Sequence, residues 1–401
     1  MSTDSFFSQQ IIFLTGSTGH FGACLLYKLV LVLQVPRVYV LIRGTPGQAI
    51  TSWVQQMPEH VPDLITSGKV LFVAGNLTQR NLGISEDNLA TMSKVVTIII
   101  HAAANISLKA SLQDAVINNC LPSLELARLA ASFNRLNSFV QVSSLFALSF
   151  LPDGPVDETL YMIDNPEEHL DRILTGSDND FNGYAWPYAK SKHLTECLLA
   201  TRYCDLPLMI LRPSSIGPAI FQPFELYGKS KSIPIHNLYS RLMYPSDRPN
   251  LFHATAGSVS GSNVLDEIPV DLLANILLQN VQRGTRGPVN ASSRFYITKT
   301  FDDFVADVHK WVPDYWKANV PLVEFTTDRN IQPCPISRFY QMGTRNWNFL
   351  SHDRQLDQSG PLAMSLEKHD AEDYTRKRVL KVFKETQGTL GQLYNRQRPR
   401  L

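Results

Sequence analysis

The sequence predicts an α/β protein built on a parallel, doubly wound sheet, with a smaller lobe toward its C-terminal end. Short apolar runs alternate with helix-like segments through the first half of the chain, as in repeated strand–helix units. Most runs are nearly continuous in Val, Ile, Leu and Phe, the composition of strands buried on both faces. Right-handed crossovers then give a Rossmann-type sheet. The expected strands are 11–15, 38–42, 70–74, 95–101, 139–143 and 208–211.

Helix-like patterns connect these strands, and the texture of the sequence changes after Arg212-Pro213. The expected connecting helices are 22–34, 111–131 and 187–201. Beyond them, Pro, Gly, Ser and aromatic residues dominate 217–262, order returns at 264–282, a further strand is expected at 294–298, and helices at 301–311 and 371–384. We therefore expect a dinucleotide-binding domain at 1–215, joined by 263–300, and a substrate-binding lobe at 216–401.

Composition excludes several classes of protein. The 401 residues carry a net charge of +1 without long charged runs, which argues against a nucleic-acid partner. The five cysteines lack paired spacing, as expected for reduced thiols in a cytoplasmic protein rather than a disulfide frame or a metal site. Residues 1–10 do not resemble a signal peptide, and charges and a proline interrupt the apolar stretch 25–40. We expect no transmembrane segment.

A glycine-rich turn follows the first expected strand and precedes a helix. Its spacing is Gly-x-x-Gly-x-x-Gly, and bare backbone at such positions lets a pyrophosphate approach the free N–H groups of a helix N-terminus. An ordinary left-handed turn would explain the glycines alone, but the strand before and the helix after favour a nucleotide site. The expected cofactor contacts here are Thr15, Gly16, Ser17, Thr18, Gly19, His20, Phe21 and Gly22.

The end of the second expected strand indicates which nicotinamide cofactor binds. An acidic residue that holds the adenosine ribose belongs at this position, yet no Asp or Glu occurs between Asp4 and Glu59. The strand ends instead in Arg43, whose guanidinium can pair with a 2′-phosphate. A solvated Arg is the alternative. The sequence therefore predicts NADPH rather than NADH.

Further cofactor contacts are expected after the third and fourth strands. Asn76, followed by Leu77, lies where a side chain can meet the adenine amino group. Ala102 and Ala103 offer small side chains beneath a flat ligand. Ordinary loop and packing roles would explain these residues equally well.

Tyr188 and Lys192 form the candidate catalytic pair. Residues four apart lie on the same face of a helix, and an ammonium beside a phenol lowers the pKa of the phenol toward working pH. Many helices carry Tyr-x-x-x-Lys by chance, with a core Tyr and a surface Lys. The glycine-rich turn upstream favours a proton donor beside a cofactor.

Taken together in sequence order, these motifs resemble the extended short-chain dehydrogenases/reductases. The matching segments are Thr15-Gly16-x-x-Gly19-x-x-Gly22, Gly75-Asn76-Leu77, His101-Ala102-Ala103, Val142-Ser143-Ser144, Tyr188-x-x-x-Lys192 and Leu211-Arg212-Pro213-Ser214. A narrower likeness to the acyl-thioester reductase branch, which includes fatty acyl-CoA reductases and terminal reductase domains of carrier-protein assembly lines, is carried by 38–43, 100–103, 211–217 and 268–271. The match covers residues 10–300.

The resemblance implies a role for each matched residue. Tyr188 would protonate the carbonyl oxygen, Ser144 would give a second hydrogen bond, and Lys192 would tune Tyr188 and hold the nicotinamide ribose. Asn118 would order a water near the lysine, with Asn119 a close alternative. Pro213 and Ser215 would contact the cofactor.

Three departures from the family pattern affect these expectations. Asn76 replaces the usual Asp, so the adenine contact differs, and Ser144 stands where this branch often has Thr, which keeps the hydroxyl. Residues 301–401 lack a clear match to the long-chain fatty acyl-CoA reductases. The acyl chain and the extent of reduction therefore stay open.

The predicted reaction is NADPH-dependent reduction of an acyl thioester to an aldehyde, or onward to an alcohol, in lipid or secondary metabolism. The thiol arrives with the substrate, so no nucleophilic cysteine or metal is needed. Without a carrier domain in the sequence, the substrate is expected as acyl-CoA or on a separate acyl carrier protein. Tyr184, Trp186 and the aromatic residues of 221–227 are candidates to line an acyl pocket.

Two other functions fit the same motifs. The nearest is an enzyme of the same fold that acts on a ketone, an aldehyde or a sugar nucleotide, because fold alone does not separate these substrates. The other is a non-catalytic NADP-sensing protein, against which the intact Ser144, Tyr188 and Lys192 argue. The sequence leaves the oligomeric state open.

Overall fold

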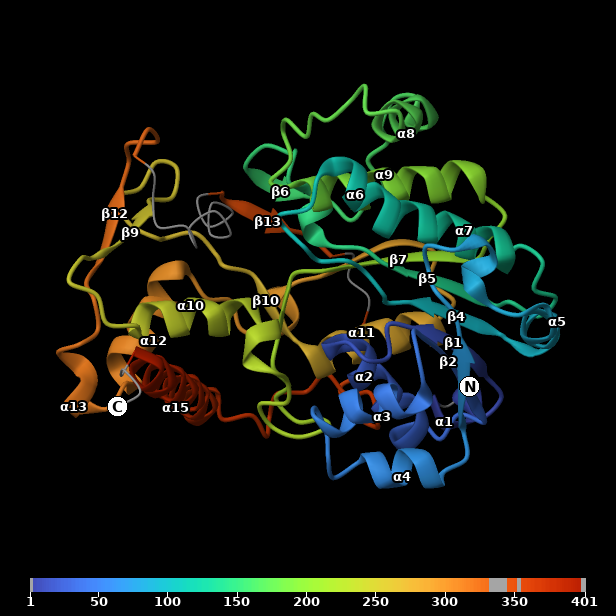
Figure 1. Ribbon diagram of the computed structural model, residues 1–401, viewed down its shortest axis with the longest axis horizontal. Coiled ribbons are helices and arrows are strands. Elements are labelled where there is room, and N and C mark those ends of the chain that lie inside the picture. Colours follow the sequence, from blue (N-terminus) through green and yellow to red (C-terminus); the bar gives the residue numbers. More distant parts are fainter. Residues whose placement is uncertain (1–2, 332–344, 352–354, 398–401) are drawn as a thin grey trace.

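A seven-stranded parallel sheet forms the centre of the molecule, in the order β11-β7-β5-β4-β1-β2-β3. The computed structural model describes residues 3–331, 345–351 and 355–397, with the side chains of Asp4 and 390–397 excepted. The doubly wound prediction is confirmed, because the strand order reverses direction between β1 and β4 (Figure 1). The strands are β1 (Ile11–Thr15), β2 (Arg37–Ile42), β3 (Val70–Ala74), β4 (Ile98–His101), β5 (Ser138–Val142), β7 (Leu208–Pro213) and β11 (Gly287–Ala291).

Helices cover both faces of this sheet (Figure 1). Successive strand residues point to opposite sides, so apolar side chains on both faces are buried beneath helices. Leu14 of β1 lies in the core beneath α2 (His20–Tyr27) and α11 (Val270–Gln282). Phe13 lies in the opposite core, beneath α7 (Leu121–Ala130) and α9 (Pro187–Arg202).

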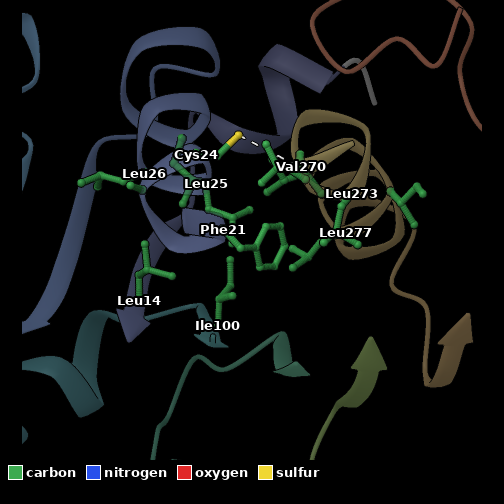
Figure 2. Close-up of a cluster of buried hydrophobic side chains, with 14 of the residues drawn as sticks. Leu14, Phe21, Cys24, Leu25, Leu26, Ile100, Val270, Leu273 and Leu277 are labelled. Atoms are coloured by element: carbon green, nitrogen blue, oxygen red, sulfur yellow. Dashed lines mark hydrogen bonds between the residues drawn. The ribbon is translucent and has the colours of Figure 1, made fainter. Parts of the chain in front are cut away.

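Figure 2 shows the first of these cores at the point where it supports the glycine-rich turn. Phe21 and Leu25 of α2 face Leu273 and Leu277 of α11, above Ile100 of β4. All five side chains are buried. The first turn of α2 is therefore fixed against both the sheet and α11.

The helix expected at 111–131 is one continuous helical stretch with a π-helical turn in its middle. It consists of α6 (Leu112–Ala115), the π turn η3 (Val116–Cys120) and α7, and Ser111 caps its start by accepting a hydrogen bond from Asp114 N at 3.0 Å. α2 likewise continues into the π turn η1 (Lys28–Val32). π turns are frequent at functional sites.

Several short helices were not expected from the sequence. The strand expected at 95–101 begins only at Ile98, because the preceding residues form α5, capped by Ser85. The unexpected helical segments, α5 included, are α1 (Thr3–Phe7), α3 (Pro46–Val54), α4 (Val61–Thr66), η2 (Arg80–Gly83), α5 (Glu86–Val95), η4 (Leu145–Leu148), α8 (Pro166–Leu174), η5 (Ser230–Ser232) and α10 (Pro234–Met243).

The strand expected at 294–298 is wrong. The last strand of the sheet is β11, which pairs with β7, and the chain then turns into the 3₁₀ helix η6 (Ser293–Phe295). Ser292 starts this helix, because its hydroxyl accepts a hydrogen bond from Arg294 N at 3.4 Å. A local side-chain cap therefore ends the extended segment.

The second lobe lies beside the carboxyl ends of the strands of the sheet (Figure 1). Its core joins α10, α12 (Phe301–Trp311) and α15 (Ala371–Gln397) through buried residues such as Leu238, Phe304 and Val379. α15 continues beyond the helix expected at 371–384, as far as Gln397. The remaining elements are α13 (Asp314–Lys317) and the strand pairs β9 (Asn250–His253) with β12 (Val323–Thr326), β8 (Ser215–Gly217) with β10 (Glu267–Pro269), and β6 (Gly154–Val156) with β13 (Trp347–Phe349).

A buried ion pair joins this lobe to the sheet side of the molecule. Arg378 of α15 donates two hydrogen bonds to Glu267 of β10, at 2.7 and 2.8 Å. No helix within the described ranges has the length and apolar character needed to cross a membrane. Among the cysteines, Cys24, Cys120 and Cys197 are free and buried and Cys204 is free and exposed, while Cys334 lies outside the described residues.

Candidate active site

The glycine-rich turn between β1 and α2 is packed too closely for side chains at two of its glycines. Gly16 has a φ of +77°, and a Cβ there would lie 2.6 Å from Ala103 N. A Cβ on Gly22 would lie 2.0 Å from Gly16 O. Gly19 is the exposed N-cap residue of α2, so the N-terminus of that helix stays accessible.

Hydrogen bonds from neighbouring elements hold this turn in place. Trp53 and Gln56, in and just after α3, donate at 2.9 Å to the carbonyl oxygens of Ser17 and Thr18 respectively. Thr15 is joined to His101 by a 2.7 Å hydrogen bond between Oγ1 and Nδ1. Trp53 and Gln56 were not identified as site residues because α3 is not apparent in the sequence, and His101 appeared there only as part of the motif His101-Ala102-Ala103.

Buried polar atoms around the turn lack partners within the described part of the protein. They include Ser17 Oγ, His20 Nδ1 and, at the start of β8, Ser215 Oγ. Buried polar groups are normally hydrogen-bonded, so these atoms fit a polar ligand such as a dinucleotide. Phe21, in contrast, points into the core (Figure 2), so any cofactor contact there falls to its backbone N–H.

The lobe segment after β8 closes against the same turn. His20 stacks on Tyr227 with ring centroids 5.2 Å apart, and Tyr227 Oη donates to His20 O at 3.0 Å. Burial lowers the pKa of His20 to about 4, so its imidazole is neutral. Tyr227 is fully buried in this contact, which corrects the expectation that it lines an acyl pocket.

The predicted adenosine-side residues lie in loops that follow β2, β3 and β4. Arg43 is exposed and forms no ion pair or hydrogen bond with any described residue, so its guanidinium is available to an anion. Asn76 Oδ1 already accepts hydrogen bonds from Thr78 N and Oγ1, at 3.2 and 3.0 Å. An adenine contact by this oxygen would therefore compete with the loop's own turn.

The other three residues of this group, and Pro213 of β7, have backbone or packing roles in the structure. Leu77 packs against the core on the α7 side of the sheet. Ala102 packs against the opposite core, and Ala103 N donates to Thr15 Oγ1 at 3.3 Å. Pro213, the last residue of β7, is buried.

The candidate catalytic pair lies in the first turns of α9. Lys192 Nζ is 5.8 Å from the centroid of the Tyr188 ring, so the two side chains share one helix face as predicted. Lys192 Nζ donates to Val142 O at 2.9 Å, which directs the ammonium toward the end of β5. Tyr188 is partly exposed, and its hydroxyl makes no hydrogen bond to a residue that the structure describes.

The direction expected for the pKa of Tyr188 is wrong. Burial raises the pKa of the phenol above its ordinary value instead of lowering it toward working pH. Burial also lowers the pKa of Lys192 to about 8, against the opposing effect of Glu196. Loss of hydration sets this direction, and Lys192 gives its hydrogen bond to the Val142 carbonyl rather than to the phenol.

The other two predicted catalytic residues differ in their placement. Ser144 is buried two residues after β5. Its Oγ accepts from Phe146 N at 3.2 Å and starts η4, which leaves the hydroxyl proton free to donate. Asn118 only donates to Asp114 O within its own helix, at 2.8 Å. Its neighbour Asn119 is buried and holds Asn105 in the loop after β4, through bonds of 2.8 and 3.1 Å.

Below Lys192 lies a buried ion pair that the sequence did not identify as part of the site. Glu196 accepts hydrogen bonds from Arg212 of β7 and from Ser143 Oγ, and both charged side chains are fully buried. Two features of the sequence could have indicated this ion pair. Glu196 lies four residues after Lys192, and an Arg occurs in Leu211-Arg212-Pro213.

The aromatic residues expected at an acyl pocket are placed differently from one another. Trp186 is buried edge-on against Phe146, and Tyr184 Oη is hydrogen-bonded to His193 Nδ1 at 2.7 Å. Phe221 and Phe224 are partly exposed. Tyr184 and Trp186 thus lie directly before Tyr188, whereas the other two lie on the lobe segment.

This arrangement defines a dinucleotide-binding protein of the extended short-chain dehydrogenase/reductase type, and solved structures share the fold. A terminal reductase domain of the myxalamid pathway matches with a TM-score of 0.56 at 20% identity, over 76% of this chain and 70% of its own. A thiolation-reductase di-domain from an archaeal non-ribosomal peptide synthetase matches with a TM-score of 0.61 at 16% identity, over 96% and 78%. A sugar-nucleotide dehydratase from Streptomyces venezuelae, solved with NAD bound, reaches 0.57 at 16% identity, over 94% and 98%.

The chain belongs to the family described as male sterility protein, an NAD-binding family whose model matches residues 14–277. It is 27% identical over 297 residues to fatty acyl-CoA reductase 1 of Xenopus laevis, covering 69% of this chain and 55% of that protein. It is 26% identical over 291 residues to fatty acyl-CoA reductase 2 of Mus musculus, covering 68% and 55%. The chain thus spans about half the length of these relatives. The resemblance to the acyl-thioester reductase branch is confirmed.

Proposed function

We propose that this protein reduces an acyl thioester, as acyl-CoA or bound to a carrier protein, to an aldehyde with NADPH. The relatives named fatty acyl-CoA reductase and the reductase domains of similar fold support the choice of a thioester. The exposed Arg43 at the end of β2 supports NADPH, because a guanidinium favours a 2′-phosphate.

One observation carries the catalytic part of the proposal. Tyr188 is a partly exposed residue on the same helix face as the buried Lys192, and its hydroxyl lacks a partner among the described residues. A free phenol that burial keeps protonated is suited to donate to a substrate oxygen.

The remaining residues have complementary tasks. The bound cofactor supplies hydride to the carbonyl carbon. Tyr188 donates a proton to the carbonyl oxygen, and Ser144 donates a second hydrogen bond to the same atom. Lys192 binds the ribose next to the nicotinamide and supports Tyr188 with its charge.

The products follow from the balance of the reaction. Hydride and one proton convert the thioester to a hemithioacetal, whose carbon–sulfur bond then breaks to give an aldehyde and a free thiol. Each turnover oxidises one NADPH and releases one thiol. Reduction of the aldehyde to an alcohol would oxidise a second NADPH and release no further thiol.

The proposal is tested by following both products at once. Purified protein is mixed with NADPH and acyl-CoAs of increasing chain length, and NADPH loss and free thiol are recorded together. We expect a ratio of one or two NADPH per thiol, depending on whether an aldehyde or an alcohol forms. NADPH oxidation with ketones, aldehydes or sugar nucleotides, without turnover of any thioester, would contradict the proposal and favour the alternative enzyme class.

A further inference from the structure

We propose that Glu196 is a positioning residue for Lys192, locked by Arg212 and Ser143, that aligns the end of β5 with α9. This inference rests on the proposed function for the role of Lys192 in turnover. Its central measurement, the titration of Lys192, needs no turnover.

The first step of the argument is the geometry of α9. Tyr188, Lys192 and Glu196 follow one another at intervals of four, so they form a single stripe along the helix. Lys192 and Glu196 are both almost completely buried. A carboxylate is rarely buried this fully unless it is paired.

The second step is the set of bonds that hold the Glu196 carboxylate. Arg212 Nε lies 3.1 Å from both carboxylate oxygens, Arg212 Nη2 donates to Oε2, and Ser143 Oγ donates to Oε1. Arg212 Nη1 donates in turn to Thr159 O at 2.8 Å. The carboxylate therefore has a single orientation fixed from β7 and from the end of β5.

The third step connects this network to both catalytic side chains. Ser143 directly precedes Ser144, and Val142, which directly precedes Ser143, supplies the carbonyl that accepts from Lys192 Nζ. The same three-residue segment thus contacts Glu196, receives the lysine and carries the second hydrogen-bond donor. A shift of Ser143 would move Ser144 and the Lys192 acceptor together.

The fourth step is the charge around Lys192. Cys120 of η3 and His101 of β4 also face this lysine, but burial raises the pKa of Cys120 to about 12 and lowers that of His101 to about 3, so both are neutral. The neighbouring Tyr188 is neutral as well. Among the groups whose charge acts on Lys192, Glu196 is therefore the anion that opposes the effect of burial.

A purely structural role is the alternative, because a buried ion pair can simply anchor α9 on the sheet. The two roles differ in what happens to Lys192 when the carboxylate loses its charge. A structural role changes the free energy of unfolding only. A positioning role also moves the titration of Lys192 to lower pH.

The test replaces Glu196→Gln and follows Lys192 by NMR of ¹³Cε-labelled lysine across pH, with the signal assigned from a Lys192→Met protein. The alkaline limb of kcat/KM for the best acyl-CoA is recorded in parallel. We expect both titrations to move down by at least about one pH unit. The matched control is Glu167→Gln. It removes a surface carboxylate of α8 that pairs with Arg202 of α9, the helix that carries Lys192. We expect the control to leave both titrations unchanged.

Glu196→Gln leaves Arg212 as an unpaired buried charge and can prevent folding. The paired variant Glu196→Gln/Arg212→Gln buries no unpaired charge, and a smaller shift to lower pH is expected because the opposing Arg212 charge is lost as well. An unchanged Lys192 titration in either folded variant would overturn the proposal and leave a structural role. A shifted titration in a protein that never turns over thioesters would instead refute the proposed function alone.

Discussion

At the scale of single residues, burial shifts the pKa values of several groups in the site. It keeps Tyr188 protonated and lowers the pKa of Lys192, while His101 and His20 stay neutral beside the glycine-rich turn. The sequence placed Tyr188 and Lys192 on one helix face because helix geometry depends only on spacing. It gave the wrong sign for the tyrosine pKa because the depth of burial is a property of the whole fold.

Arg43→Asp tests the cofactor assignment at this scale. An aspartate would repel a 2′-phosphate and accept from a ribose hydroxyl, so the KM for NADPH should rise by at least about tenfold while that for NADH stays equal or falls. Steady-state kinetics with each cofactor measure this change. Arg37→Asp, at the opposite and also exposed end of β2, is the control and should change neither value. Equal increases for both cofactors would refute NADPH selection by Arg43.

At the scale of elements, strands were more apparent in the sequence than helices. β1 and β3 begin and end where their apolar runs do; β1 is buried along most of its length, and β3, an edge strand, keeps a continuous apolar run although it is only partly buried. α3 and α5 were missed because much of their surface is exposed and their starts depend on Thr45 and Ser85 side-chain caps. The caps become visible only when the backbone is known.

Gly22→Ala tests the close contact between the glycine-rich turn and α2. The new Cβ would lie 2.0 Å from Gly16 O, so the turn must open, and we expect a loss of about 3 kcal/mol in the free energy of unfolding with weaker cofactor binding. Gly388→Ala in α15 is the control, because no atom lies within 4 Å of its Cβ position. Alanine there should stabilise the protein by about 1 kcal/mol. Urea unfolding and NADPH fluorescence titration measure both effects, and equal outcomes for the two variants would contradict this account.

At the scale of the whole molecule, the two halves of the chain differ in how much the sequence predicts. The sheet order follows from repeated strand–helix units, whereas the lobe combines α10, α12 and α15, which are far apart in the sequence. The contact between Tyr227 and His20 spans both parts, so no local pattern could reveal it. The same long-range burial makes the stability of the molecule depend on pH.

Burial lowers the pKa values of several histidines, to about 4 for His20 and to about 3 for His101, and also lowers those of His193, His236 and His369. The unfolded chain takes up these protons near its ordinary pKa of about 6.5, before the folded protein does. The contribution of these histidines to the free energy of unfolding is therefore fully present above that pH. It is lost as the pH falls toward 4.

Asp266 acts in the opposite direction, because burial raises its pKa to about 6 and the folded state binds that proton first. Setting the three histidines with the largest lowering, His20, His101 and His236, against this carboxyl, we expect a net uptake of about two protons on unfolding, a loss of about 3 kcal/mol per pH unit below pH 6. Urea unfolding at a series of pH values measures the slope. A free energy of unfolding that is constant from pH 7 to pH 5 would contradict these assignments.

The central claim is that the Tyr188 hydroxyl protonates the oxygen of a carbonyl reduced by a bound nicotinamide. Tyr188→Phe removes that hydroxyl alone, and Tyr203→Phe, just after the far end of α9, is the matched control. We predict that Tyr188→Phe lowers kcat for acyl-CoA reduction by about 100-fold or more, with NADPH affinity and unfolding midpoint unchanged, and that the control is fully active. Wild-type turnover by a folded, NADPH-binding Tyr188→Phe protein would contradict the account.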